Sequence, residues 1–427
     1  MKEVELISSA WYGDKAKKIR FPISWDVKVV GDEFYPTLND EEIKTAFIHP
    51  ISSPPISDLA PGKNRVAILV DDITRPTPAA ILIPHILQEL RVAGVQDEAI
   101  TIIIAGGSHR PATKDEIIKK IGSIPSTINV FGHDCKQNLE YLGESPRGTP
   151  IFVNEEVLKC DLKIGVGCIY PHASAGFSGG SKIIMPGVCG LETSMYAHKT
   201  LQKAKTRGEF SQTDFRREIE DIAQRVGLDF IVNVVLNQAR QITGLFVGDR
   251  ILAHQKGVEF ATKLYSVRVI EDADIVITDV YPFDVYFNFA FNRGLWNVLG
   301  AKRNTTTIAI AACPMGIGHH ELYTLALSSL RERAIRKLKN FQIQDLYYPI
   351  KQIKKITSHF QTKKERRGEL MVLSEGITSE ELKSIFPEGK LYQSWDELLP
   401  EIENRFRKPP VKVAVYRCAP LLLPTGL

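Results

Sequence analysis

Three short segments combine polar side chains with glycine in patterns that could do chemistry. Asp71–Arg75 (DDITR) offers two carboxylates beside a guanidinium. Gly106–Arg110 (GGSHR) offers an imidazole after two glycines, which allow the backbone to turn sharply and approach a ligand. The third segment, residues 170–187, contains His172, several hydroxyl groups, glycines and Lys182. Together these side chains could supply acid–base catalysis and anion binding.

The first two segments also have a purely structural explanation. Asp72 and Arg75 can form an ion pair that does no more than brace their own loop. A single loop histidine such as His109 is often just a packed or solvated residue. Thr77 and Pro78, which follow the first segment, are typical of the N-cap and first residue of a helix, here predicted over Ala79–Val92.

The third segment has the composition of a phosphate cradle, in which backbone N–H groups and an ammonium meet anionic oxygens. It is not a Walker A loop, because Ser181 separates Gly180 from Lys182 and an isoleucine follows the lysine. Glycine-rich turns without a ligand have the same composition. The candidate cofactor contacts are Thr74, Ser178, Gly179, Gly180 and Lys182.

His198, sixteen residues beyond Lys182, is a candidate metal ligand or a packed histidine. The sequence contains no H-x-x-x-H, H-E-x-x-H or C-x-x-C spacing that would form a metal site by itself. Any metal here would therefore need a ligand from a group other than the protein.

The elements that must position these residues are short apolar runs alternating with segments of helical length. Continuous apolar runs predict strands that are covered on both faces, as in parallel sheets. We therefore expect an α/β protein with mostly parallel sheets, whose ligands bind beyond the carboxyl ends of the strands. The predicted strands are Val66–Val70, Ala99–Ala105, Leu162–Cys168, Ala273–Val280, Thr306–Ala312, Leu370–Leu373 and Val411–Val415.

A length of 427 residues predicts more than one domain. A long helix candidate ends near residue 264 and a new alternation of strands begins at Ala273. We expect an N-terminal α/β domain over 1–268 and a C-terminal α/β domain over 269–410. The terminal strand in 411–427 could finish the second sheet or return to the first domain.

Composition limits the classes of partner and compartment. The net charge of +4 is too small to indicate nucleic-acid binding. Residues 331–367 carry twelve Lys/Arg and three Asp/Glu, which fits a solvated helical face or, alternatively, a polyanion-binding face. Six dispersed cysteines and the lack of an apolar signal core or membrane-length run predict a cytoplasmic protein without a membrane partner.

Five motifs, in this order and spacing, resemble the nickel-dependent lactate racemase family. They are DDITRPTP (Asp71–Pro78), GGSHRP (Gly106–Pro111), HASAGFSGGSK (His172–Lys182), MPG (Met185–Gly187) and AHK (Ala197–Lys199). The resemblance implies two α/β domains with the active site in the cleft between them. It also implies a nickel-pincer nucleotide derived from nicotinic acid and tethered to a lysine through a thioamide.

The resemblance assigns a role to each matching residue. Lys182 corresponds to the tether and His198 to the histidine that completes the nickel coordination. His109 and His172 correspond to the two acid–base histidines. Arg75 and Asp72 correspond to the pair that orients the substrate and contacts the cofactor.

One segment departs from the family pattern. In lactate racemases a glutamine and a lysine that hold the substrate follow a P-x-D motif, whereas Phe289 and Asn292 stand near those places after Asp284. Arg293 could replace the lysine if the register slips by one residue. The amides of Asn288 and Asn292 would suit the hydroxyl groups of a longer sugar acid. Alternatively, this helix simply packs its aromatic face.

These observations favour an isomerase that inverts C2 of a 2-hydroxy acid, with a longer polyhydroxy (aldonic) acid as a candidate substrate. Removing a proton from C2 would create a very unstable dianion, whereas hydride transfer to a cofactor avoids it. Two histidines would serve the two enantiomers. The alternatives are a lactate racemase proper and a non-catalytic protein that carries the nucleotide. The partners expected are the small hydroxy acid and the proteins that make the cofactor.

Overall fold

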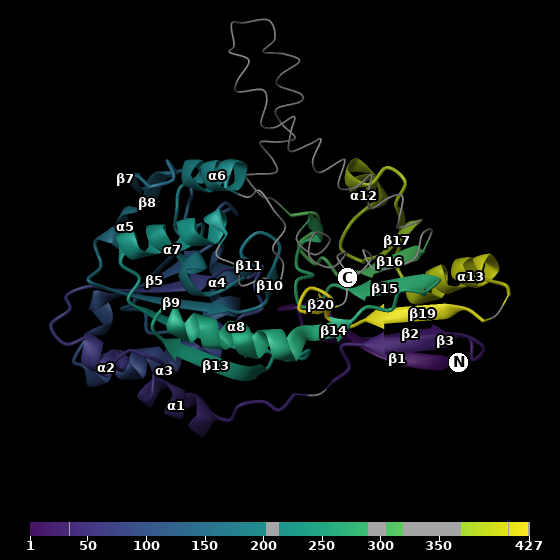
Figure 1. The fold of residues 1–427 in the computed structure, drawn as a ribbon, viewed down its shortest axis with the longest axis horizontal. Coiled ribbons are helices and arrows are strands. Elements are labelled where there is room, and N and C mark those ends of the chain that lie inside the picture. Colours follow the sequence, from purple (N-terminus) through teal and green to yellow (C-terminus); the bar gives the residue numbers. More distant parts are fainter. Residues whose placement is uncertain (34, 202–212, 289–304, 319–368, 409, 426–427) are drawn as a thin grey trace, which may run out of the picture. The chain divides into compact units, whose positions relative to one another are not determined.

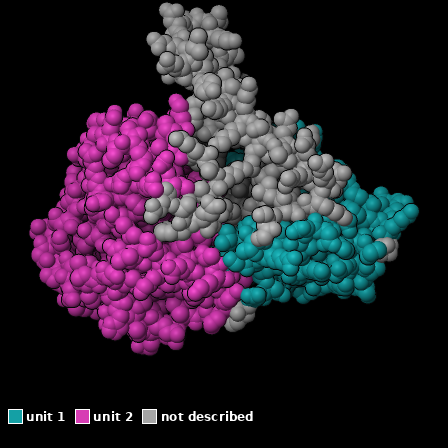
Figure 2. Space-filling model, in the orientation of Figure 1, with its two compact units in different colours: residues 1–33, 265–319, 323–427 teal, residues 34–264, 320–322 magenta. Residues whose placement is uncertain are grey.

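The computed structural model describes residues 1–33, 35–201, 213–288, 305–318, 369–408 and 410–425. Asn292, Arg293 and the basic segment 331–367 lie outside the described residues. The chain forms two compact units: Met1–Glu33, Tyr265–His319 and Tyr323–Leu427 make one, and Phe34–Leu264 with His320–Leu322 makes the other (Figure 2). We call them the outer unit, which contains both chain ends, and the middle unit.

The middle unit is built on a six-stranded sheet in the order β13-β12-β9-β4-β5-β6 (Figure 1). All neighbours pair in parallel except β13, which runs antiparallel to β12. The strands are β4 (Val66–Asp71), β5 (Ile100–Ala105), β6 (Asn129–Gly132), β9 (Leu162–Cys168), β12 (Phe230–Leu236) and β13 (Ile242–Gly248). The inner strands β5, β9 and β12 are buried at every position, because helices cover both faces of the sheet.

Helices and short hairpins surround this sheet. Figure 1 shows α7 on one side of it and α1 and α3 on the other. The helices are α1 (Asp40–Ile48), α2 (Ile56–Leu59), α3 (Ala79–Val92), α4 (Lys114–Ile121), α5 (Glu155–Leu158), α6 (Leu191–Thr200), α7 (Asp214–Val226) and α8 (Leu252–Tyr265), with the 3-10 turns η1 (Asp97–Ala99) and η2 (Gly180–Ile183). The hairpins are β7 (Leu139–Glu144) with β8 (Pro150–Asn154), and β10 (Pro171–His172) with β11 (Gly176–Phe177).

The outer unit contains a second six-stranded sheet, in the order β18-β17-β16-β15-β19-β3, and every pair in it is parallel. Its strands are β3 (Asp26–Val30), β15 (Ile275–Asp279), β16 (Thr306–Ile310), β17 (Leu370–Leu373), β18 (Lys390–Tyr392) and β19 (Lys412–Tyr416). The remaining described elements are β1 (Lys2–Ser8) and β2 (Lys15–Phe21), β14 (Ser266–Arg268) paired with β20 (Leu423–Thr425), α12 (Ser379–Ile385) and α13 (Trp395–Arg405).

The predicted α/β class with mostly parallel sheets is confirmed, and each of the seven predicted strands is present in one of the two sheets. The division into units differs from the predicted 1–268 and 269–410. Residues 1–33 belong to the outer unit, because β3 hydrogen-bonds to β19. The strand in 411–427 does not return to the first domain, because β19 lies between β15 and β3 in the second sheet.

Among the described residues, no helix combines the length and apolar character needed to cross a membrane.

A buried histidine at the end of β6 predicts a pH-dependent stability. Burial lowers the pKa of His133 from 6.5 to about 4, and its Nε2 is 3.0 Å from the carbonyl oxygen of Cys189. As the pH falls from 6.5 towards 4, the unfolded chain binds a proton at this side chain and the folded chain does not. The free energy of unfolding should therefore fall over this range, with His133 contributing at most ~1.4 kcal/mol per pH unit.

Urea unfolding of the protein at a series of pH values checks this expectation. A His133→Gln variant should show a shallower pH slope, and the exposed His49→Gln variant should keep the parent slope. Equal slopes for all three proteins would contradict the expectation.

Candidate functional site

Three adjacent parallel strands of the middle unit end at the same edge of its sheet. β4 pairs with β5 on one side and with β9 on the other, so that Asp71 lies opposite Ala105 and Val70 opposite Val166. Parallel strands deliver the segments that follow them to one edge. The three segments whose side chains could do chemistry follow the ends of these strands. They are therefore brought together as predicted.

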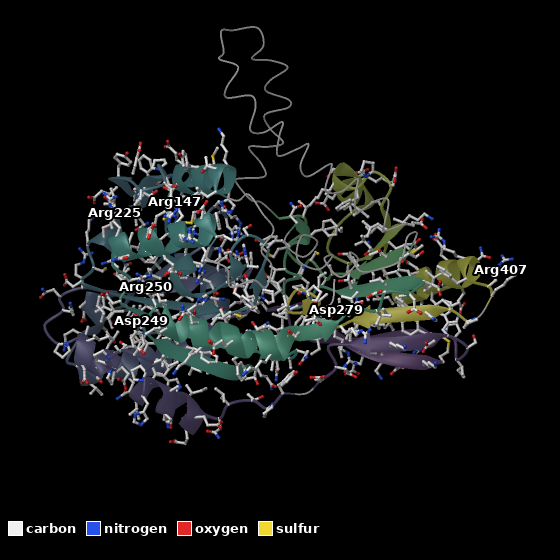
Figure 3. The ribbon with its side chains drawn as sticks, in the orientation of Figure 1. Arg147, Arg225, Asp249, Arg250, Asp279 and Arg407 are labelled. Atoms are coloured by element: carbon white, nitrogen blue, oxygen red, sulfur yellow. The ribbon has the colours of Figure 1, made fainter. Side chains whose placement is uncertain are left out.

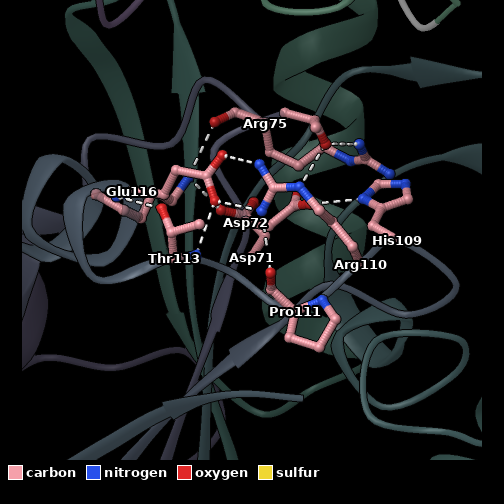
Figure 4. A network of polar contacts seen from close by, with 10 residues as sticks. Asp71, Asp72, Arg75, His109, Arg110, Pro111, Thr113 and Glu116 are labelled. Carbon is pink, nitrogen blue, oxygen red and sulfur yellow. Dashed lines mark hydrogen bonds and ion pairs between the residues drawn. The ribbon is translucent and has the colours of Figure 1, made fainter. Parts of the chain in front are cut away.

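The carboxylate of Asp72 is the centre of a buried network at this edge (Figure 4). Its Oδ2 is 2.5 Å from Nδ1 of His109, and its Oδ1 accepts a hydrogen bond of 2.6 Å from the hydroxyl of Thr74. The Thr74 hydroxyl in turn accepts a hydrogen bond of 2.5 Å from Nη1 of Arg75. Thr74 thus links the carboxylate to the guanidinium.

The charges around Asp72 keep it ionised and determine the tautomer of His109. Burial alone would raise the pKa of Asp72, but the interaction with His109, the charge of Arg75 and the hydrogen bonds from His109 and Thr74 outweigh burial. The pKa consequently lies well below its ordinary value. An ionised carboxylate can only accept hydrogen bonds, so Nδ1 of His109 carries a hydrogen and its Nε2 carries the basic lone pair.

A fully buried lysine stabilises the segment Asp71–Arg75. Lys120 is 1% exposed, and its Nζ lies 2.6 Å from Oδ1 of Asp71 and 2.9 Å from the carbonyl oxygen of Arg75.

The predicted N-cap role of Thr77 is wrong. The N-cap of α3 is Pro78, and the hydroxyl of Thr77 instead donates a hydrogen bond of 2.6 Å to Asp71, whose buried carboxylate competes for it.

Removing the lysine should have a large effect on stability. In Lys120→Met, the side chain keeps a similar volume but Asp71 is left as a buried, uncompensated charge. We expect a loss of about 3–5 kcal/mol in the free energy of unfolding. Urea unfolding measures it, with the exposed neighbour Lys119→Met as the matched control. A Lys120→Met protein as stable as Lys119→Met would show that the ion pair is not needed.

Arg110 has a structural role beside His109. It donates two hydrogen bonds to Glu116, of 2.8 and 2.6 Å, and Glu116 also accepts from the backbone N–H of Thr113 at the start of α4. Figure 4 shows this second network next to the Asp72 network. It holds the segment that carries His109 against the first turn of α4.

The third segment folds back on itself as the small β10–β11 hairpin. His172 lies in β10, where its Nδ1 accepts hydrogen bonds of 3.2 and 3.3 Å from the backbone N–H groups of Ser174 and Ala175. The neutral ring therefore carries its hydrogen on Nε2. The hydroxyl of Ser178 donates to the carbonyl oxygen of Cys168 at 2.6 Å and accepts from the N–H of Tyr170, so that it stabilises the hairpin.

Gly179 and Gly180 are required by the geometry before Lys182. Both have positive φ, of 78° and 57°. A Cβ at Gly179 would lie 2.7 Å from Oδ1 of Asn233, and one at Gly180 would lie 2.8 Å from Cγ of His254. No other residue fits both the backbone conformation and the space. Lys182 follows in the turn η2.

His198 lies on α6 in an environment that suits a metal ligand. Its Nδ1 donates to the carbonyl oxygen of Ser194 at 2.7 Å, and its ring packs against Phe215 with centroids 4.9 Å apart. Burial, together with the nearby positive charge of Lys182, lowers the pKa of His198 from 6.5 to about 4. The ring is thus neutral with its lone pair on Nε2, as in metal-bound histidines that donate Nδ1–H to a carbonyl.

The described residues contain no group of three or more His, Cys, Asp or Glu side chains that could hold a metal ion. A metal bound at His198 would take its other ligands from a cofactor. The pairing of a neutral histidine with a nearby lysine in a glycine-lined loop fits a metal carried by a group attached at Lys182.

Of the three predicted substrate contacts, only Asn288 is among the described residues. Asn288 belongs to the outer unit, where its Nδ2 donates to the carbonyl oxygen of Gly318 at 3.2 Å. Asn292 and Arg293 lie outside the described residues. Sequence reasoning missed Lys120, Asn233 and His254. The signal for Asn233 was an amide in an otherwise apolar strand, FIVNVVL, since a buried polar group requires partners.

Comparison with known proteins decides the family. Residues 12–208 match the family model described as the lactate racemase N-terminal domain. The lactate racemase of Lactiplantibacillus plantarum is 34% identical over 292 residues, which cover 66% of this chain and 68% of that protein. The lactate racemase of Thermoanaerobacterium thermosaccharolyticum is 32% identical over 296 residues, which cover 67% and 69%. The chain belongs to the lactate racemase family.

Solved structures share its fold. The lactate racemase apoprotein from Thermoanaerobacterium thermosaccharolyticum aligns over 100% of both chains, with a TM-score of 0.74 and 23% identity. A Thermotoga maritima protein aligns over 92% of this chain and 99% of its own, with a TM-score of 0.65 and 16% identity. Members of the lactate racemase family are isomerases of the racemase type and are known to use a nickel-pincer cofactor. The enzyme hypothesis is therefore supported over a non-catalytic carrier.

Proposed function

We propose that this lactate racemase family member inverts C2 of a 2-hydroxy acid, with a nickel-pincer nucleotide attached at Lys182. The observation that carries the proposal is the buried Asp72–His109 pair at the same sheet edge as His172 and the Lys182 loop. It combines an oriented base with an attachment point for a cofactor, which is what inversion of an unactivated carbon requires.

The residues that would hold the cofactor come from the third segment and α6. Lys182 provides the covalent attachment, and His198 provides one nickel ligand through Nε2. The backbone at Gly179 and Gly180 allows close approach of the nucleotide. When bound, the cofactor supplies a hydride acceptor, so that no dianion has to form at C2.

His109 acts as the base for one enantiomer in this proposal. As the C2–H bond breaks and the C2–O bond becomes a carbonyl, the hydroxyl proton passes to Nε2 of His109. Asp72 stabilises the resulting imidazolium through Nδ1–H, as the acid does in hydrolase triads. Arg75 lies beside this pair and can hold a carboxylate or a developing alkoxide.

His172 would serve the other enantiomer in this proposal. To accept a proton at Nε2 its ring must carry the hydrogen on Nδ1, the reverse of the tautomer that the backbone N–H groups of Ser174 and Ala175 favour in this structure. The carboxylate of Asp72 already holds the hydrogen of His109 on Nδ1, so that His109 needs no such change. During turnover the proton accepted by one histidine must be balanced by the proton given by the other, since the product contains the same atoms as the substrate.

The substrate proposed is a longer polyhydroxy acid, whose hydroxyl groups would be recognised by Asn288, Asn292 and Arg293. Lactate is the competing substrate. The test is to incubate cofactor-loaded protein with single enantiomers of lactate and with C2 epimers of aldonic acids, and to separate the products on a chiral column. Interconversion of aldonic acids with poor turnover of lactate is expected. Interconversion of neither acid, while a known family member loaded in the same cells is active, would overturn the proposed function.

A further inference from the structure

Polar side chains of three other elements form hydrogen bonds with the loop that carries Lys182. Oδ1 of Asn233 on β12 accepts a hydrogen bond of 2.6 Å from the backbone N–H of Gly180. Nε2 of His254 on α8 lies 2.7 Å from the carbonyl oxygen of Ser178. The hydroxyl of Ser181 donates to Oε2 of Glu220 on α7. Three of the four residues before Lys182 are therefore each bound to a different part of the fold.

His254 has one possible tautomer in this arrangement. Nη2 of Arg216 lies 2.8 Å from its Nδ1, and a guanidinium can only donate, so Nδ1 must accept. Nε2 then carries the hydrogen and donates it to Ser178. Burial, together with the charge of Arg216, holds the pKa of His254 well below its ordinary value. The ring is consequently a neutral bridge between Arg216 and the loop.

Arg216 is itself fixed by an ion-pair network. It is 5% exposed and pairs with Oε1 of Glu220 at 3.1 Å, while Arg250 pairs with Oε2 of the same carboxylate at 2.7 Å. Arg250, labelled in Figure 3, precedes α8. The network joins α7 and α8 to the loop through charge-assisted bonds, which are shorter and stronger than neutral ones.

We propose that His254 and Arg216 are positioning residues that set the conformation of Ser178–Lys182 and so present the amino group of Lys182 to the cofactor. This inference rests on the proposed attachment at Lys182. The close contacts of Gly179 and Gly180 with Asn233 and His254 support it, because the loop follows the surface of these side chains without room for a Cβ.

The test uses two readouts on the full chain. The first is the rate at which N-hydroxysuccinimide acetate acetylates Lys182 in protein produced without the cofactor, relative to the exposed Lys199, measured by peptide mapping. The second is the fraction of Lys182 that carries an adduct when the protein is produced with nickel-pincer biosynthesis. In His254→Leu, we expect the relative acetylation rate to change and the adduct fraction to fall, because a misplacement of ~1 Å would slow adduct formation about a hundredfold.

A conservative variant separates positioning from general damage. The amide of His254→Gln can donate to Ser178 and accept from Arg216, so it should restore both readouts. Ser181→Ala, which removes the hydroxyl bonds to Glu220 and Arg250 and leaves the ion pairs of Glu220 with Arg216 and Arg250 in place, provides a milder perturbation if His254→Leu does not fold. The exposed His49→Leu is the control, and circular dichroism checks the fold of each protein.

Each outcome has a distinct meaning. Parent-like acetylation and adduct formation in folded His254→Leu, or in folded Ser181→Ala if His254→Leu does not fold, would overturn the positioning role. An altered acetylation rate, with no adduct even on the parent protein, would support the positioning role and contradict the attachment itself. Failure of His254→Gln to restore either readout in a folded protein would also overturn the role assigned to His254.

Discussion

Lys182→Arg is expected to abolish attachment of the cofactor and, with it, all isomerisation. Arginine keeps the positive charge and much of the length of lysine, so the loop should fold normally. Its guanidinium stays protonated and offers no amine for a covalent bond. Intact mass and peptide mapping of protein produced with nickel-pincer biosynthesis should show an adduct on the parent chain at Lys182 and none on the variant.

The matched control is Lys199→Arg, the same substitution at an exposed position next to His198. It should retain the adduct. A known family member produced in the same cells shows that the cells make the cofactor. An unmodified parent chain beside a loaded family member would exclude covalent attachment at Lys182, and an adduct on Lys182→Arg would place the attachment at another residue.

Asp72→Asn should lower turnover by about 10²–10⁴-fold, the usual contribution of a positioned acid–base group. The amide can donate its hydrogen to Nδ1 of His109, which moves the ring hydrogen to Nε2 and removes the basic lone pair. Loading at Lys182 should persist, because Asp72 bonds to Thr74 and His109 rather than to the Lys182 loop. Turnover of the parent and of the variant is compared after each is divided by the amount of protein that carries the adduct. This separates the effect on catalysis from any effect on loading.

Stability gives a second readout for the same variant. The pKa of Asp72 lies below its ordinary value, so the ionised group stabilises the folded protein at neutral pH, and this stabilisation is lost as the pH falls through the lowered pKa. Asp72→Asn should therefore be less stable than the parent at neutral pH. Asp115→Asn, at an exposed position on α4, should match the parent in both turnover and stability. Parent-like turnover in loaded Asp72→Asn would show that His109 does not depend on this carboxylate.

The sequence was sufficient to predict the parallel strands and the positions of Asp72 and His109 at strand ends, but not the contact between these two side chains. Continuous apolar runs such as Leu162–Cys168 can only be strands covered on both faces, and segments after adjacent parallel strands must share an edge. The helix Ala79–Val92 was predicted with its observed bounds. Thr77 was misassigned because the capping pattern ignores a buried carboxylate six residues earlier.

Other features depend on contacts that no local pattern contains. The strand β3 has a partner near the other end of the chain, so its place in the second sheet could not be inferred from its own residues. His254 lies in a helix without a motif around it, and its importance comes from Arg216 and Ser178, which are far away in sequence. Asn233 was recognisable as a polar residue in an apolar strand, but its partner, the backbone N–H of Gly180, could not be inferred from the sequence.

The pairing of β3 with β19 also determines the order in which the protein is completed during its synthesis. Asp26 lies opposite Lys412, so its partner is made 386 residues later. At about 5–20 residues per second, β3 waits roughly 20–80 s on the ribosome before its neighbour exists. The whole of residues 34–264 is translated within that interval. The middle unit, with Lys182 and both histidines, can thus complete its sheet while the outer sheet still lacks a strand.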